Sequence, residues 1–179
     1  MKEHSPTVIE AAKKIKLIAF DVDGVLTDGK ISYTSSGEEF KSFNVRDGHA
    51  IKMASRAGLT VAVITGRESP MVKRRCDELG IALLFQGVRD KSLSLADILE
   101  RTGLASFEIA YMGDDVVDLP VMMSVGLSCC PSDAANEVRQ RSSFVTKAPG
   151  GNGAARELVF FILQEQDLLE GIMQRYMPS

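Results

Sequence analysis

Four short stretches of this sequence combine acidic side chains, glycines, a threonine and a lysine in patterns suited to binding a metal ion and a phosphate. They are DVDGVLTDG (21–29), TGR (65–67), DK (90–91) and GDDVVD (113–118). Crowded carboxylates repel one another, so a positive charge is expected between them. Asp21 and Asp114 together offer the oxygen ligands that Mg²⁺ prefers, and the sequence therefore predicts a Mg²⁺ site.

A phosphate beside this metal predicts phosphoryl transfer, in which positioning and charge neutralisation supply most of the catalysis. Asp21 is the candidate nucleophile, which would become an aspartyl-phosphate. Asp23 is the candidate general acid and base, because it lies two residues further along the same loop. The Thr65 hydroxyl, the Gly66 N–H and the Lys91 ammonium are the candidate phosphate contacts.

Three further acids have competing interpretations. Asp115 and Asp118 are expected to orient the metal-bound waters and Lys91. They can also be read as a helix N-cap and a first-turn acid that complements the helix dipole. Asp28, followed by Gly29, is better explained as the start of a turn than as a catalytic group.

Alternating strands and helices must bring these stretches together. The predicted strands are 16–20, 59–64, 82–85, 109–112, 126–129 and 144–145. The predicted helices are 48–57, 69–79, 91–102, 117–123 and 134–141. This alternation indicates an α/β fold with a parallel sheet covered on both faces. Ligand sites in such sheets form beyond the carboxyl ends of the strands, where the four stretches would converge.

Two segments depart from this alternation. Residues 30–44 alternate apolar and polar side chains on both sides of a turn, which predicts a β-hairpin. Residues 153–177 form a long helical pattern that follows PGGNG. The tail carries many apolar residues, including Leu158 and Phe161, so it is expected to pack on the sheet or on a neighbouring subunit.

The composition limits the classes of partner. With 179 residues the chain suits one domain, and a net charge of −3 and the absence of Trp argue against a nucleic-acid partner. No apolar stretch is long enough to span a bilayer, and the start, MKEHSPTVIEAAKKIK, lacks the apolar run of a secretion signal. Cys129 and Cys130 are adjacent, which disfavours a disulfide between them. We therefore expect a cytoplasmic protein with reduced thiols and no membrane partner.

The motifs DVDGV, the threonine of TGR, the lysine of DK and GDDVVD, in this order, resemble those of the haloacid dehalogenase-like phosphohydrolases. FNVRDG, RRC (74–76), YMGDDVVDLPVM and PGGNGAARE extend the resemblance to a capless subgroup and over nearly the whole chain. It implies a Rossmann-like three-layer α/β/α parallel sheet in one domain, 1–179. That domain would carry a hairpin flap (30–44) and a C-terminal tail and helix (150–179), with no cap domain.

The resemblance also implies a substrate and an assembly. The substrate would be an acidic sugar phosphate, 3-deoxy-D-manno-octulosonate 8-phosphate, whose hydrolysis leads towards lipopolysaccharide. The alternative is a related nine-carbon keto-acid sugar 9-phosphate. A non-catalytic binding module would be expected to lack Asp21 or Asp23, and both are present. Subunits of a homotetramer would wall the open site through their flaps.

The site residues that the resemblance implies extend beyond the four motifs. The metal ligands would be Asp21, Asp23 and Asp114. The substrate contacts would be Asp23, Asn44, Val45, Arg46, Asp47, Gly48, Lys52, Gly66, Arg67, Arg75 and Lys91. Arg75 would come from an adjacent subunit, as would residues 150–153 and Arg156 where they close over the sugar. Lys52 stands where arginine is expected in relatives, and helical arginines often simply face water.

Overall fold

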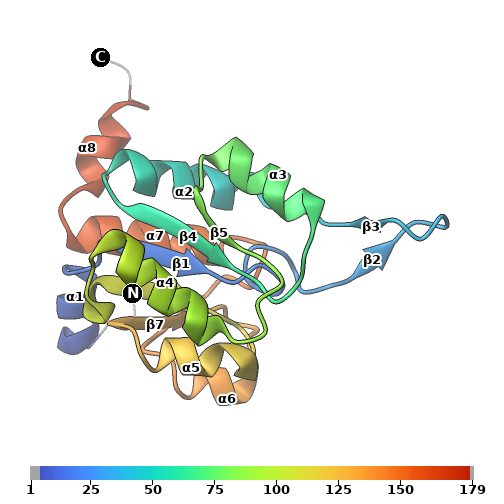
Figure 1. Ribbon diagram of the computed structural model, residues 1–179. Coiled ribbons are helices and arrows are strands. Elements are labelled where there is room, and N and C mark those ends of the chain that lie inside the picture. The colour runs from blue at the N-terminus through green and yellow to red at the C-terminus, as the bar shows by residue number, and fades with distance from the viewer. Residues whose placement is uncertain (1–4, 178–179) are drawn as a thin grey trace.

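A six-stranded parallel sheet lies at the centre of the structure, with strand order β5-β4-β1-β6-β7-β8 (Figure 1). The computed structural model describes residues 5–177. The strands are β1 (Leu17–Phe20), β4 (Thr60–Ile64), β5 (Leu83–Phe85), β6 (Ile109–Met112), β7 (Leu127–Cys130) and β8 (Phe144–Val145). Each predicted strand is present, with its ends within one residue of the expected positions.

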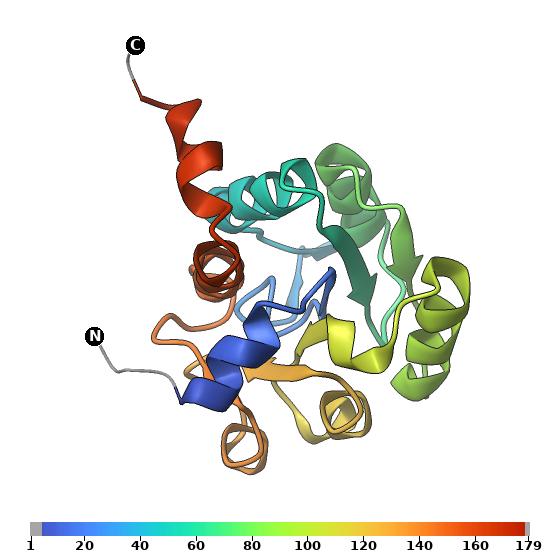
Figure 2. The same ribbon diagram turned by 90° about the vertical axis from the view of Figure 1, so that its left-hand side faces the viewer.

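Helices cover both faces of the sheet (Figure 2). One face carries α1 (Pro6–Ala12), α2 (Val45–Arg56), α3 (Pro70–Leu79), α7 (Ala154–Glu165) and α8 (Leu169–Gln174). The other carries α4 (Lys91–Thr102), α5 (Leu119–Met122) and α6 (Asn136–Arg139). The side chains of β1 alternate between two cores. Ile18 and Phe20 lie in the first core, beneath α1, α2, α3, α7 and α8, whereas Leu17 and Ala19 lie in the second core, beneath α4, α5 and α6. The three-layer α/β/α fold predicted from the sequence is confirmed.

The connections leave no space for a cap domain. Residues 29–44 hold only the hairpin of β2 (Ser32–Tyr33) and β3 (Glu39–Phe40), which projects from the body at the carboxyl-end side of the sheet (Figure 1). Short 3₁₀ turns, η1 (Ser106–Glu108) and η2 (Val116–Asp118), flank β6. No helix among residues 5–177 is both long and apolar enough to cross a lipid bilayer.

Several helical boundaries differ from the sequence prediction: α5 and α6 are shorter than the predicted 117–123 and 134–141, and the differences at α2 and in the C-terminal tail have clear causes. Helix α2 begins at Val45 rather than at residue 48, because the Asn44 side chain accepts a hydrogen bond from the Arg46 N–H at 2.8 Å and caps the helix. The pattern at 153–177 is not one helix, since the chain turns at Asp167, which has φ of 57°. The turn lets Leu168 and Ile172 pack back onto the first core.

The start of α7 depends on a side chain from α2. Gly153 is the N-cap residue of α7 and has no side chain to bind the free N–H groups of the first turn. Asp47 supplies the missing acceptor: its carboxylate accepts from Gly153 N at 3.0 Å and from Arg156 N at 2.8 Å. Burial is the main reason that its pKa is raised, although these two N–H groups act against the rise. Asp47 therefore joins the tail to α2.

We predict that Asp47→Ala lowers the free energy of unfolding by about 1 to 2 kcal/mol, the usual cost of losing a helix cap. Denaturant unfolding measures the change. Asp90→Ala is the matched control, because Asp90 caps α4 through one exposed hydrogen bond to Ser92 N and should cost less. Equal losses in the two variants would show that Asp47 does not anchor the tail.

Candidate active site

The four motif stretches meet in one pocket of about 360 Å³ at the carboxyl ends of the strands. Its lining includes eight of the predicted site residues: Asp21, Asp23, Thr65, Gly66, Arg67, Lys91, Asp114 and Asp115. Gly29, Val88, Arg89 and Val117 complete the lining. A larger cavity of about 420 Å³ lies at the amino-terminal ends of the strands and contains none of the predicted site residues.

Asp118 is the fully buried centre of a hydrogen-bond network beneath this pocket. Its Oδ1 accepts from Lys91 Nζ at 2.6 Å and from the Tyr111 hydroxyl at 2.6 Å. Its Oδ2 accepts from the backbone N–H groups of Asp114 at 3.0 Å and Asp115 at 3.2 Å. Asp118 thus positions Lys91, whose Nζ also lies 3.0 Å from Oδ1 of Asp21.

Both interpretations of the GDDVVD acids have support in these contacts. Asp115 is the N-cap residue of η2, where its side chain accepts from Val116 N at 2.7 Å. Asp118 makes the contact with Lys91 that its orienting role requires. Tyr111 was not singled out in the sequence, because it lies within the apolar strand β6 and its hydroxyl partner follows only after the chain turns.

The pKa values at the site reflect excess negative charge in a buried place. Burial, with a smaller effect from the Asp118 charge, raises the pKa of Asp21 to about 6, although Lys91 acts in the opposite direction. Burial and then the charges of Asp21, Asp118 and Asp115 raise the pKa of Asp114 to about 7. Burial opposes the charge on Lys91, but Asp21 and Asp118 outweigh it and raise the pKa of Lys91.

These acids fit a divalent cation. Carboxylate oxygens of Asp21, Asp114 and Asp118 lie within 4.8 Å of one another. Both oxygens of Asp118 already accept hydrogen bonds, so Asp21 and Asp114 are the carboxylates left to face a cation. Gly24 permits this approach, because it has φ of 89° and a Cβ atom there would overlap the Asp114 carboxylate.

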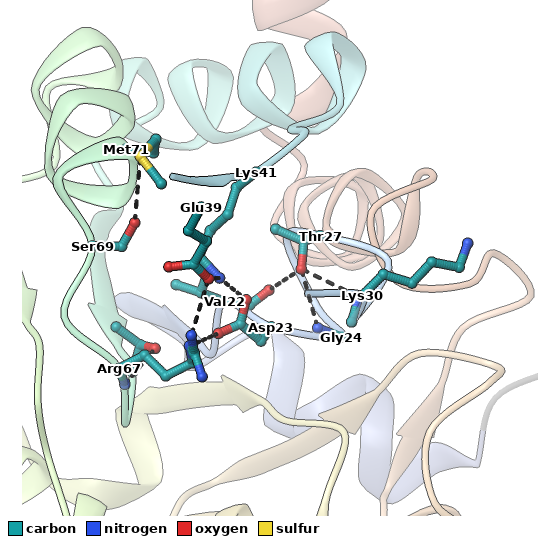
Figure 3. Close-up of polar contacts among 12 residues, drawn as sticks. Val22, Asp23, Gly24, Thr27, Lys30, Glu39, Lys41, Arg67, Ser69 and Met71 are labelled. Carbon is teal, nitrogen blue, oxygen red and sulfur yellow. Dashed lines mark hydrogen bonds and ion pairs between the residues drawn. The ribbon is translucent and has the colours of Figure 1, made fainter. Parts of the chain in front are cut away.

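Asp23 lies outside this acidic cluster, and its place among the metal ligands stays a prediction. Figure 3 shows its carboxylate directed towards Lys41 and Arg67. Lys41 and its neighbour Glu39 come from the flap, and neither was identified from the sequence. The sequence did contain one signal for them. Glu39 and Lys41 are two residues apart in the second arm of the hairpin (residues 39–41, called the β-arm below), and this spacing places both side chains on one face.

The remaining predicted substrate contacts do not line this pocket. They are Asn44, Val45, Arg46, Asp47, Gly48, Lys52 and Arg75. All lie on α2 or against it: Arg75 Nη2 donates to the Asn44 carbonyl at 3.4 Å, and its guanidinium lies 5.9 Å from the centre of the Phe43 ring. Their substrate roles, and those of residues 150–153 and Arg156, stay predictions.

Comparison with known proteins gives the site a family context. Residues 84–158 match the haloacid dehalogenase-like hydrolase family. The chain is 45% identical over 166 residues to the 3-deoxy-D-manno-octulosonate 8-phosphate phosphatase KdsC of Salmonella typhimurium, a match that covers 93% of this chain and 88% of that protein.

Solved structures agree with this match. The 3-deoxy-D-manno-octulosonate 8-phosphate phosphatase of Yersinia pestis superposes with a TM-score of 0.91 at 42% identity, over 93% of this chain and 90% of that one. The corresponding phosphatase of Moraxella catarrhalis, solved with magnesium, phosphate and a KDO molecule, gives a TM-score of 0.94 at 38% identity. That match covers 97% of this chain and 100% of the other.

The raised pKa values of Asp21 and Asp114 predict a pH-dependent response to metal. A carboxyl group whose folded pKa is raised stabilises the fold below its unfolded pKa, and this contribution is lost as pH rises through the folded value, here about 6 to about 7. Without divalent metal, the melting temperature should therefore fall between about pH 5 and about pH 8 through these groups.

Mg²⁺ should reverse this loss. Because the ligands must be deprotonated, the rise in melting temperature on adding Mg²⁺ is expected to be larger at about pH 8 than at about pH 5.5. At about 100 times its Kd, Mg²⁺ would add about 2.7 kcal/mol. Differential scanning fluorimetry measures the shift, and Asp114→Asn should abolish most of it. A shift of the same size at both pH values would contradict the assignment.

Proposed function

The chain belongs to the haloacid dehalogenase-like hydrolases, in the group of the 3-deoxy-D-manno-octulosonate 8-phosphate phosphatases, and on this basis we propose its reaction. It is a Mg²⁺-dependent phosphomonoester hydrolase that removes phosphate from 3-deoxy-D-manno-octulosonate 8-phosphate. The observation that carries the proposal is the placement of Asp21 beside Lys91 and Asp114, in a pocket that also holds Thr65 and Gly66.

Asp21 is suited to the role of nucleophile. With a pKa of about 6, its carboxylate is mostly ionised at neutral pH, and Lys91 holds one oxygen at 3.0 Å. Its attack forms an O–P bond as the bond from phosphorus to the sugar oxygen breaks, which gives an aspartyl-phosphate. Water then attacks phosphorus, which releases phosphate and restores the Asp21 carboxylate.

Asp23 is suited to the proton transfers of both steps. It lines the pocket two residues from the nucleophile, and its side chain is 23% exposed. In the first step it gives a proton to the departing sugar oxygen, and in the second it takes a proton from the attacking water. One group therefore serves as acid and then as base.

The phosphate is held by the groups around Asp21. The Thr65 hydroxyl, the Gly66 N–H and the Lys91 ammonium all line the pocket and can donate to phosphate oxygens. Bound Mg²⁺ supplies positive charge that offsets the carboxylates and the negative charge of the transferred phosphoryl group. Asp21 and Asp114 are the residues that would hold it.

We propose that the sugar and carboxylate end of the substrate is bound partly by a neighbouring subunit. Arg67 lines the pocket of its own chain, whereas Arg75, Lys52 and residues 44–48 do not. An arginine can donate two parallel bonds to a carboxylate, which suits an acidic sugar. The position of Arg75 outside its own pocket supports a role at the site of an adjacent chain.

We propose a homotetramer in which the flaps associate and wall the open sites. Three large apolar side chains of the flap are strongly exposed in the single chain: Ile31 at 50%, Tyr33 at 60% and Phe40 at 50%. Exposed apolar clusters of this kind mark protein interfaces. Residues 5–177 contain no cap domain that would otherwise shield the reacting phosphate from water.

The cellular setting is proposed on chemical grounds. Cys76, Cys129 and Cys130 are buried free thiols, which suits a reducing compartment such as the cytoplasm. The product of the proposed reaction is the sugar acid used towards lipopolysaccharide. We therefore place the enzyme in the cytoplasmic synthesis of that precursor.

The test of the proposed reaction is phosphate release by the purified protein with Mg²⁺. The eight-carbon sugar acid 8-phosphate should be preferred over a nine-carbon 9-phosphate and a hexose 6-phosphate by at least about 10-fold in kcat/KM. Asp21→Asn should lower kcat by at least about 1,000-fold. Asp28→Asn is the control, because Asp28 lies in the same loop but pairs with Lys30 in solvent. Preference for either of the other substrates would overturn the assignment.

The flap variants Tyr33→Glu and Phe40→Glu, combined, should break the assembly. We expect light scattering to give the mass of four 19.5 kDa chains for the unmodified protein and a smaller mass for the variant. Without neighbours to wall the site, kcat/KM for the sugar phosphate should fall about 10-fold. Phe107→Glu, which changes a 57% exposed phenylalanine away from the flap, should alter neither quantity. An unchanged mass in the flap variant would exclude this interface.

A further inference from the structure

A closed ring of four alternating charges joins the flap to the proposed proton-transfer group (Figure 3). Lys41 Nζ lies 2.5 Å from Asp23 Oδ1 and 3.3 Å from Glu39 Oε1. Arg67 closes the ring, with Nη2 at 3.1 Å from Glu39 Oε1 and Nε at 4.0 Å from Asp23 Oδ2. The positive charges of Lys41 and Arg67 thus alternate around the ring with the carboxylates of Asp23 and Glu39.

Lys41 has the most buried side chain of the four residues in this ring. Its side chain is 2% exposed, whereas that of Arg67 is 43% exposed. A lysine ammonium is seldom buried unless it is paired, because loss of hydration is costly. The charge of Lys41 is therefore held in place by Asp23 and Glu39, and in return it fixes one oxygen of Asp23. Arg67 faces the other oxygen from a longer distance.

The geometry of the β-arm explains why a flap residue can reach this point. Glu39 and Lys41 are two residues apart, so they share one face of the arm, and that face lies against the loop after β1. Phe40, between them, faces away and is half-exposed. One face of the arm thus carries the charges that meet the site, and the other carries apolar surface.

We infer that Lys41 is the positioning residue of the acid–base group: its ammonium binds Oδ1 of Asp23 and so orients Oδ2, which Arg67 faces only at 4.0 Å, as the oxygen that carries the proton to the departing sugar oxygen and takes one from the attacking water. This inference deepens the proposed function and rests on it. Lys41 touches Asp23 rather than the pocket, since it is not among the residues that line the pocket. Its effect on catalysis therefore passes through Asp23.

The test compares two substrates whose leaving groups differ in their need for a proton. A sugar alkoxide must be protonated as it departs, whereas p-nitrophenolate leaves readily without a proton. Lys41→Met should lower kcat/KM for the sugar phosphate by about 10- to 100-fold, a share of the usual contribution of general acid–base catalysis. For p-nitrophenyl phosphate the loss in kcat/KM should stay below about 3-fold, because Asp21 and the phosphate contacts are intact.

A double variant separates action through Asp23 from an independent effect. If Lys41 acts only by positioning Asp23, Lys41→Met combined with Asp23→Asn should be as slow on the sugar phosphate as Asp23→Asn alone, within about 2-fold. Losses that multiply in the double variant would overturn the inference. Equal losses on both substrates in Lys41→Met, or no loss, would overturn it as well.

Lys30→Met is the matched control, since Lys30 is the first residue of the same flap and pairs with Asp28, but its side chain is 78% exposed. It should leave both substrates unaffected. Thermal unfolding monitors the fold of each variant, and Lys41→Gln replaces Lys41→Met if the latter does not fold, with the same dependence on leaving group expected. Failure of the unmodified protein to release phosphate would reject the proposed function instead.

Discussion

The negative charge gathered at the carboxyl ends of β1 and β6 is the constraint on which the rest of the site depends. Asp21, Asp114 and Asp118 place carboxylate oxygens within 4.8 Å of one another in a largely buried place. Burying charges without compensation is costly. The fold compensates one of the three fully, through Lys91, Tyr111 and two backbone N–H groups on Asp118. The other two keep raised pKa values, so the site is prepared to exchange protons for a divalent cation.

Two lysines, from different parts of the chain, each bind one of the two acids of the loop after β1. Lys91 begins α4, is held by Asp118 of η2, and reaches the proposed nucleophile Asp21. Lys41 comes from the flap and reaches Asp23. The two acids are only two residues apart, yet their cationic partners come from different segments, α4 for Asp21 and the flap for Asp23. This separation keeps the carboxylates in different surroundings, and different surroundings allow neighbouring acids to take different roles.

The sequence was sufficient for the sheet and for the convergence of the four motifs, because both follow from hydrophobic periodicity and from the rule that parallel strands end at one edge. It was insufficient for Tyr111 and Lys41, whose partners lie 7 and 18 residues away and meet them only after a turn or the docking of the flap. The break at Asp167 was hidden for a related reason: no glycine or proline marks it, and the turn is fixed by packing of the residues beyond it. Sequence patterns report local preference, and these features depend on tertiary contacts.

The flap also shows how an open site can be ordered when residues 5–177 include no cap domain. The flap has only two short strands, and an isolated two-stranded hairpin is marginally stable in water. Its charged face is nevertheless tied to the site by Lys41 and Glu39, while its apolar face, with Tyr33 and Phe40, remains available to another chain. Association through the apolar face would restrict the hairpin further, and the restriction would reach Asp23 through Lys41. Assembly and proton transfer would then be coupled by one β-arm, without the lid that an inserted domain would provide.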